Sequence, residues 1–404
     1  MTPFMKKNAL LSFFILIGSV APAIAQTGSV SGVITDSLTG QPVANLTVFI
    51  PSSTFGTITN QKGEYHLGRL NPGDYTLMFR HLSYPTTTRL ISVEPGKPVI
   101  LNLALSEESR KLNEVSIIGR IPDQRLAFHL FKTYFLGDQK EATCILQNPQ
   151  DLKFYEDGGT LKAVAKNPLI ITNRHLGYRI TFFLDYFNYV EDKNPDTGLG
   201  RNDYFSYGGS ALFQDLSVVI PIMTMGWRVA RKNEFKGSLK HFLAALYRDQ
   251  LTKEHYYLRT TFQSPEDLQL AEKRSNAMTK IRWAETDSLF NMDPAIHKSS
   301  YLHYYPAEEY PLSQNQITAG LQTGEKKLQA VPSLLVFSDY RKTRDLRDDW
   351  ISTLRIPEKG IIFDQDGNYR VPEGTLSWIN HDNSLQIIRL LPSDYMPKLN
   401  ENHR

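Results

Sequence analysis

The feature that most constrains the fold is a series of short alternating segments, split by turn residues, that begins at Ser29. Apolar and polar residues alternate from Ser29 to Ile34 and again from Val43 to Ile50, and Gly40 and Pro42 lie between the two runs. A period of two is typical of half-buried β-strands, and Gly and Pro favour the turns that join them. Residues 27–106 are therefore predicted to form an all-β sandwich.

The order of the turns is more specific than the alternation. The segment contains Gly32-x-Ile34-x-Asp36, Thr39-Gly40-Gln41-Pro42-Val43, Gly56-Thr57-x-Thr59-Asn60-x-x-Gly63-x-Tyr65 and Pro72-Gly73-x-Tyr75-x-Leu77. It resembles the carboxypeptidase regulatory-like domain, and the resemblance implies a transthyretin-like β-sandwich that is an appendage to other domains. Gly63 and Gly73 are expected to adopt positive φ, and Tyr65 and Tyr75 to point inward. None of these residues is placed for chemistry.

The N-terminus is typical of a secretory signal. Lys6 and Lys7 precede the mostly apolar run from Asn8 to Val20, and Ala23-Ile24-Ala25 supplies the small residues that a signal peptidase needs. Residues 1–25 are therefore predicted to be a signal peptide, with cleavage between Ala25 and Gln26. The protein is expected to be exported, either to the periplasm or in association with the outer membrane.

No transmembrane segment is expected once the signal has been removed. The apolar run of the signal is shorter than the roughly 20 residues that cross a bilayer as a helix. The longest later candidate, Leu216 to Trp227, contains Pro221 and is interpreted as a buried strand.

The charge balance argues against a nucleic-acid partner, and the cysteine content excludes an internal disulfide. Lys6 and Lys7 account for two of the 45 basic residues, which leaves 43 against 42 acidic residues in the exported chain. That balance provides no dominant basic field for nucleic acid or for anionic lipid, so no nucleic-acid partner is expected. Cys144 is the only cysteine, so no internal disulfide is possible, and its apolar neighbours indicate a buried, inert thiol.

The rest of the chain is predicted to be a linker, residues 107–120, and an α+β domain, residues 121–404. An apolar stripe between Gln124 and Leu136 predicts a helix that ends at Gly137, and Asp157-Gly158 predicts a hairpin. Ser238 is placed to cap a second helix, and a third is expected from Ser264 toward Phe290. Another hairpin is expected at Asp366-Gly367. The domain is too short for the barrel of an outer-membrane receptor.

A second resemblance concerns this domain. It is carried by Tyr134-Phe135-Leu136-Gly137, Asn148-Pro149, the stretch from Pro168 to Tyr178, Gly237-Ser238-Leu239-Lys240-His241-Phe242-Leu243 and Leu390-Leu391-Pro392-Ser393-Asp394-Tyr395. These stretches are similar to an uncharacterised partner domain that follows the sandwich in exported proteins of Bacteroidetes-type bacteria. The resemblance implies no activity.

The sequence predicts no catalytic, cofactor-binding or metal-binding residues, and no cofactor. None of the ten histidines has Glu three positions later, as a zinc carboxypeptidase requires, and no His-Glu-x-x-His, Gly-x-Ser-x-Gly or Walker A motif is present. Asp364 to Asn368 resembles the start of a calcium loop, but Thr375 stands where the twelfth-position Glu should be, which favours a turn. The stretch from His297 to His303 lacks metal-ligand spacing.

Three hypotheses for function remain open. The first is an exported, non-catalytic binding protein of the cell envelope that contacts a protein or a glycan, since 41 Phe and Tyr residues could furnish aromatic contact surface. The second is a structural envelope component that docks by strand addition. The third is an unrecognised hydrolase that acts on glycan, because hydrolases can lack sequence signatures. The sequence leaves the oligomeric state open.

Overall fold

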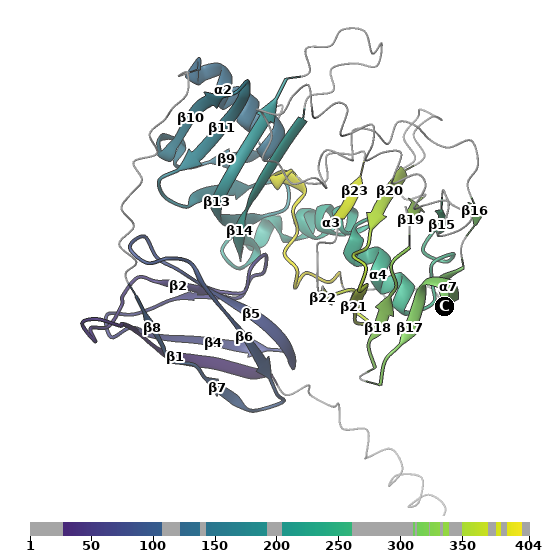
Figure 1. Ribbon diagram of the computed structural model, residues 1–404, viewed down its shortest axis with the longest axis horizontal. Coiled ribbons are helices and arrows are strands. Elements are labelled where there is room, and N and C mark those ends of the chain that lie inside the picture. The colour runs from purple at the N-terminus through teal and green to yellow at the C-terminus, as the bar shows by residue number, and fades with distance from the viewer. Residues whose placement is uncertain are drawn as a thin grey trace, which may run out of the picture. The chain divides into compact units, whose positions relative to one another are not determined.

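The chain divides into two compact units. One consists of Met1–Pro51 with Phe55–Arg110, and the other consists of Ser52–Thr54 with Lys111–Arg404. The computed structural model describes residues 27–106, 122–137, 143–191, 204–260, 310–311, 313–322, 324–331, 334–338, 350–370, 377–380 and 386–397 (Figure 1). The predicted signal peptide with its Ala25–Gln26 cleavage site, the linker 107–120, the helix from Ser264 and the stretch from His297 to His303 lie outside these residues.

The first unit is an all-β sandwich, as predicted. One sheet has the order β4-β1-β7, with β8 pairing farther along β1, and the other has the order β3-β2-β5-β6 (Figure 1). The strands are β1 (Gly28–Asp36), β2 (Thr47–Phe49), β3 (Gly56–Ile58), β4 (Glu64–Leu70), β5 (Gly73–Arg80), β6 (Thr87–Val93), β7 (Pro98–Ile100) and β8 (Leu103–Leu105). β1 pairs in parallel with β7 and β8, and the other pairs are antiparallel.

Alternation along these strands builds the core of the sandwich. Tyr65 and Leu67 on β4 and Leu77 and Phe79 on β5 are buried, while the residues between them are more exposed. The Tyr65 hydroxyl donates to the Leu101 carbonyl oxygen at 2.8 Å, as an inward-pointing tyrosine should. Tyr75 is only half-buried, so its expected inward position is reached in part.

Gly63 occupies a turn that another residue would strain. Its φ is +72°, and a Cβ at this position would lie 2.3 Å from the Ile34 carbonyl oxygen. A side chain is therefore excluded both by backbone conformation and by close approach, which explains why the turn before β4 uses glycine.

The second unit begins with a helix packed on a six-stranded sheet. The strands are β9 (Cys144–Leu146), β10 (Leu152–Asp157), β11 (Thr160–Ala165), β12 (Leu169–Asn173), β13 (Tyr178–Val190) and β14 (Tyr204–Asp215). β13 pairs with β14 along its whole length and also with β11 and β12. The helix α2 (Gln124–Phe131) continues as a π-helical turn, Lys132–Leu136, and ends at Gly137, where φ is +77°. The predicted helix and its glycine stop are confirmed.

Aromatic rings join α2 to this sheet. Phe131 and Phe135 are fully buried, and their rings pack edge-on against Phe187 of β13, with centroids 5.0 and 6.4 Å away. The predicted hairpin is present: Asp157 pairs with Thr160, and Gly158 and Gly159 both have positive φ, which suits the right-handed twist of the two strands.

A second core lies beneath the helix α4 (Leu239–Tyr247), which is capped by Ser238 as predicted. It packs against two further sheets, with orders β16-β15-β19-β20-β23 and β17-β18-β21-β22. These contain β15 (Tyr256–Thr260), β16 (Tyr310–Pro311), β17 (Thr318–Gly320), β18 (Lys326–Leu328), β19 (Leu334–Ser338), β20 (Trp350–Arg355), β21 (Ile361–Phe363), β22 (Tyr369–Arg370) and β23 (Ser377–Asn380), and the short helix α7 (Gln314–Ile317) precedes β17. The α+β prediction for this part of the chain is confirmed.

One predicted element is wrong. The segment Leu216 to Trp227 forms two short 3₁₀ turns, Leu216–Val218 and Pro221–Met223, and then the start of the helix α3 (Thr224–Phe235). Pro221 cannot donate a ladder hydrogen bond, and the Asp215 carboxylate accepts from the Ser217 N–H at 2.8 Å and so starts the first turn. Among the helices that the structure describes, none is long and apolar enough to span a membrane.

Candidate functional site

The helix α3 is held to the sheet by a buried arginine. The Arg231 guanidinium donates to both carboxylate oxygens of Asp215, each at 2.8 Å, and to the carbonyl oxygens of Leu176 and Gly177 at 2.7 and 2.9 Å. It also stacks on the Tyr178 ring, with the guanidinium carbon 3.9 Å from the centroid. All these partners satisfy the buried cation, so the cluster anchors α3.

The same cluster shifts two pKa values. Burial raises the pKa of Asp215, but the hydrogen bonds from Arg231 and Ser217 outweigh it and hold that pKa below its ordinary value. Burial raises the pKa of Tyr178. The Asp215 carboxylate is thus ionised and the Tyr178 phenol neutral near pH 7. Both side chains act by holding Arg231 in place.

The outer face of α3 and the turns before it expose a set of aliphatic side chains, which we call the apolar ridge. Their exposed fractions lie between 41% and 90%, and the members are Val218, Val219, Ile220, Ile222, Met223, Met225 and Val229. Burial on the opposite face is limited to Trp227, Arg231 and Phe235, which recur every four residues. The helix therefore buries an arginine between two aromatic residues and exposes aliphatic ones.

A histidine connects α4 to β15. His241 is buried, its Nδ1 lies 2.8 Å from the Tyr256 hydroxyl oxygen, and its Nε2 lies 3.4 Å from a Glu254 carboxylate oxygen. The Gly237 N–H donates to Nδ1 at 3.3 Å, which leaves the proton on Nε2 facing Glu254. Burial lowers the pKa of His241 to about 4, against the opposing effect of Glu254. The imidazole is neutral at pH 7 and fixes the start of α4 against β15.

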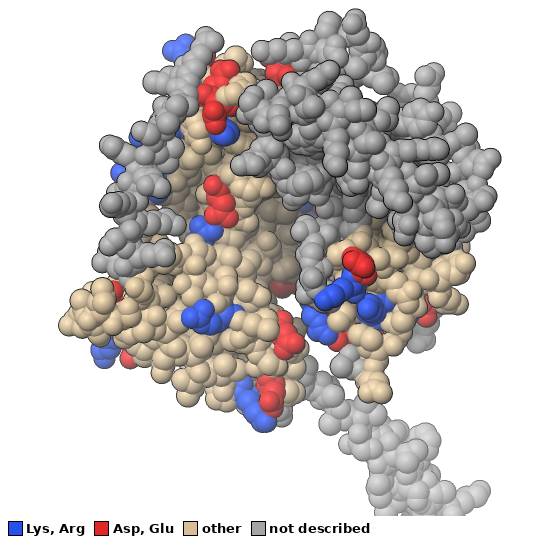
Figure 2. Space-filling view, in the orientation of Figure 1, with Lys and Arg blue, Asp and Glu red and all other residues tan. Residues whose placement is uncertain are grey.

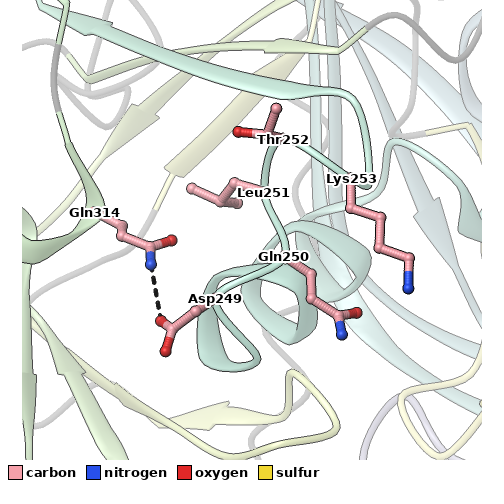
Figure 3. A pocket seen from close by; sticks show the side chains of 6 residues that line it. All are labelled: Asp249, Gln250, Leu251, Thr252, Lys253 and Gln314. Atoms are coloured by element: carbon pink, nitrogen blue, oxygen red, sulfur yellow. Dashed lines mark hydrogen bonds between the residues drawn. The ribbon is translucent and has the colours of Figure 1, made fainter.

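The turn between α4 and β15 forms one wall of an open pocket of about 560 Å³. Its lining residues are Asp249, Gln250, Leu251, Thr252, Lys253 and Gln314 (Figure 3). The Asp249 carboxylate accepts from the Gln314 amide at 3.0 Å and from the Lys326 ammonium at 2.8 Å. Asp249 has a φ of +55°, a conformation that carries strain in a non-glycine residue.

The chemistry of this pocket is that of hydrogen bonding. It offers a carboxylate, two side-chain amides, a hydroxyl and an ammonium, and in Figure 3 the Gln314 amide reaches toward Asp249. Such groups can donate to and accept from hydroxyl-rich ligands. Leu251 is buried in the second core of this unit and so anchors the turn.

Two sequence-derived interpretations of single residues are confirmed by the structure. Cys144 lies on β9 and is only 4% exposed, as its apolar neighbours predicted. Asp364 caps a tight turn by accepting from the N–H groups of Asp366 and Asn368, at 2.9 and 3.0 Å, so the turn interpretation is right. Within the part of the chain that the structure describes, no three His, Cys, Asp or Glu side chains come together as a metal site.

Surface charge on the face drawn in Figure 2 is mixed in sign. Figure 2 shows Lys and Arg interspersed with Asp and Glu among the described residues of this face. One close pair, Lys97 with Glu94, is exposed on the sandwich, where such a pair contributes little to stability.

Comparison with known proteins identifies the first unit. A family model for the CarboxypepD_reg-like domain matches residues 30–117. The chain carries a CarboxypepD_reg-like domain. The family resemblance inferred from its turns is therefore confirmed, and the match continues past residue 106, where the sandwich was predicted to end. No curated protein matches the chain.

Solved structures share only low similarity with the chain. The minor pilin of Streptococcus agalactiae has 17% identity over 20% of this chain and 45% of its own, with a TM-score of 0.18. A type II cohesin–X-dockerin complex of Acetivibrio cellulolyticus has 23% identity over 18% and 51%, with a TM-score of 0.17. A DUF3823 family protein of Parabacteroides merdae has 14% identity over 49% and 85%, with a TM-score of 0.17. The chain spans about half the length of the first two, and such scores support no functional inference.

Sequence reasoning missed both the apolar ridge and the pocket. The ridge had a detectable signal, since Leu216 to Asn233 contains no acidic residue and Pro221 interrupts any strand. The pocket had none, because Gln314 lies 61 positions or more from the turn that it faces and no spacing rule joins them.

Proposed function

We propose that this protein is an exported, non-catalytic binding protein of the cell envelope whose second unit binds a glycan. The polar pocket at Asp249–Lys253 and Gln314 carries the proposal, because its carboxylate, amides and hydroxyl match the donors and acceptors of sugar hydroxyl groups. His241 acts as a positioning residue, since its contacts with Glu254 and Tyr256 join α4, which precedes the turn that lines the pocket, to the residues that follow this turn.

The signal-like N-terminus supports export. Cleavage after Ala25 would leave Gln26 as the first residue, and N-terminal sequencing of the protein from fractionated cells tests this. Recovery of the Met1 form from the cytosol would overturn the envelope location. We also propose that residues 107–120 are a linker between the sandwich and a domain that comprises residues 121–404. Limited proteolysis that cuts first within 107–120 would support this division.

Glycan binding is tested by titration calorimetry with a panel of soluble polysaccharides and peptidoglycan fragments. Gln250→Ala and Gln314→Ala should each weaken binding about tenfold, because each removes side-chain hydrogen bonds to the ligand. Gln329→Ala is the matched control, since Gln329 is an exposed glutamine outside the pocket. Binding that is unchanged in both pocket variants, or no binding to any member of the panel, would overturn the proposal.

The same panel separates binding from hydrolysis. A hydrolase would release new reducing ends from a bound polysaccharide, whereas a binding protein leaves the chain length unchanged. Turnover that disappears when one carboxylate of the second unit is neutralised would replace the binding proposal by the glycan-hydrolase hypothesis.

One observation favours the structural alternative. Among the described strands β6 pairs only with β5, so it is an edge of its sheet and could accept a strand from a neighbour. Leu90 on β6 is 76% exposed. If strand addition holds the protein in the envelope, Leu90→Lys should reduce its recovery in the envelope fraction while leaving glycan binding intact.

A further inference from the structure

The apolar ridge is too exposed to be part of the core of the second unit. Ile222 and Val218 are 90% and 82% exposed, and Met225 is 69% exposed. Scattered apolar residues on a surface need no explanation, but seven exposed aliphatic side chains within twelve positions are dense enough to indicate an interaction surface.

The exposed charged residues of α3 that share a face with the ridge have one sign. Arg228 and Lys232 are exposed on the face of α3 that also carries Met225 and Val229, because positions three, four and seven apart share a helix face. No Asp or Glu occurs between Leu216 and Asn233. The two acids that flank this segment are engaged, Asp215 by Arg231 and Glu234 by His175 at 3.5 Å.

The loop of Arg174 lies against the buried face of α3, opposite the ridge. Arg174 is exposed, and its carbonyl oxygen accepts from the Trp227 indole N–H at 2.9 Å, which fixes the loop of Arg174 against α3. The near-neutral charge of the whole chain therefore does not describe the exposed face of α3, whose charged residues, Arg228 and Lys232, are both cationic.

We propose that the apolar ridge inserts into the headgroup region of an anionic phospholipid bilayer, with Arg228 and Lys232 at the depth of the phosphates. Aliphatic side chains next to Lys and Arg, with no carboxylate between them, are the composition of surface-seeking amphipathic segments. The cations attract the anionic surface and the aliphatic groups leave water for the acyl boundary. Since α3 is short, the segment lies on the membrane and does not cross it.

Vesicle flotation tests the proposal. The chain from Gln26 onward is used, because the apolar run before it would bind lipid by itself, and all described residues are retained. It should float with phosphatidylcholine vesicles that contain phosphatidylglycerol, and less with phosphatidylcholine alone. Ile222→Ser with Met225→Ser should lower the bound fraction at least tenfold. The matched control is Leu90→Ser with Ile100→Ser, two equally exposed aliphatic residues of the sandwich, which should change nothing.

Two further measurements distinguish insertion of the ridge into a bilayer from docking of another partner on it. Arg228→Gln with Lys232→Gln should remove the preference for anionic vesicles and leave weak binding to neutral ones. A polarity-sensitive dye on Ile222→Cys, in a Cys144→Ala background, should shift to shorter wavelength on vesicles, whereas the same dye on Leu90→Cys should not. Circular dichroism verifies that each variant is folded.

Several results would overturn the proposal. The first is no flotation with either vesicle, and the second is equal flotation of the Ile222 and Met225 double variant. A third is a dimer that this double variant dissociates in the absence of lipid, which would assign the ridge to a second copy of the chain. Glycan binding at the pocket is independent of all three.

Discussion

The helices α3 and α4 follow one another in the chain but bury their side chains to different extents. α4 buries six consecutive residues, from His241 to Leu246, and its apolar side chains enter the second core of the unit. α3 buries Trp227, Arg231 and Phe235 and leaves its Met and Val residues in solvent. An apolar sequence therefore indicates burial only where a neighbouring surface is available to cover it.

The cause of the difference is the way each helix is anchored. α4 is held by a broad apolar contact, to which Phe242 and Leu246 contribute with no exposed surface. α3 is held by directional bonds, from Arg231 to Asp215 and from the Trp227 indole to Arg174. Directional bonds fix a helix with few side chains, which leaves its other face free for an interaction.

The largest expected effect is on α4. Phe242→Ala should lower the free energy of unfolding by about 4 kcal/mol, because a fully buried ring is lost and a cavity remains. Val229→Ala on α3, where the side chain is 58% exposed, should change it by less than about 0.5 kcal/mol. Urea unfolding followed by tryptophan fluorescence measures both, since all four tryptophans lie after residue 121. Equal losses would refute the contrast between the helices.

A smaller loss is expected from the anchor of α3. Arg231→Met should cost about 3 kcal/mol, because it leaves the Asp215 carboxylate and two carbonyl oxygens without their donor. This loss of unfolding free energy is at the low end of the range for a broken buried ion pair, because the Asp215 side chain is 34% exposed. Arg228→Met on the exposed face is the control. Adding Asp215→Leu to Arg231→Met should recover part of the loss, and no recovery would show that the ion pair is not the cause.

Close packing of Gly177 on α3 gives a third test. Its φ is +68°, and a Cβ would lie 2.1 Å from the Trp227 ring. Gly159 has a φ of +78° but no atom within 4 Å of such a Cβ. Gly177→Ala should therefore be about 2 kcal/mol more destabilising than Gly159→Ala, the difference being the steric overlap with Trp227. Equal thermal or urea stability of the two variants would mean that the ring moves aside at little cost.

These contrasts also explain how far the sequence could predict the structure. The sandwich, α2, α4 and the hairpins at Gly158 and Gly367 follow from local signals, since glycine turns, caps and alternation act within a few residues. The prediction of a buried strand at Leu216 to Trp227 was wrong. The apolar content of this segment, taken alone, cannot reveal that the contact with the sheet is made through Arg231. The pocket depends on a long-range approach of Gln314 to Asp249, which no local pattern encodes.

The smallest effect concerns the histidine at the junction of the two helices, where the ring of His241 lies 5.1 Å from that of Phe235 on α3. Its pKa is about 4 in the folded protein, below the ordinary value of 6.5. Between these values the unfolded chain binds a proton that the folded protein does not, so stability is complete above pH 6.5 and is lost as the pH falls toward 4.

The loss attributable to His241 should be about 1–2 kcal/mol between pH 7 and pH 5. It is obtained as the difference in unfolding free energy between the wild type and His241→Gln at each pH, with exposed His129→Gln as the control for loss of a histidine. His241→Gln should be less stable at pH 7, where it loses bonds to Tyr256 and Glu254, and should depend less on pH below 6.5. Parallel pH profiles for the wild type and His241→Gln would mean that Glu254 holds the imidazolium well enough to offset its burial, and an ion pair would then join α4 to the turn before β15.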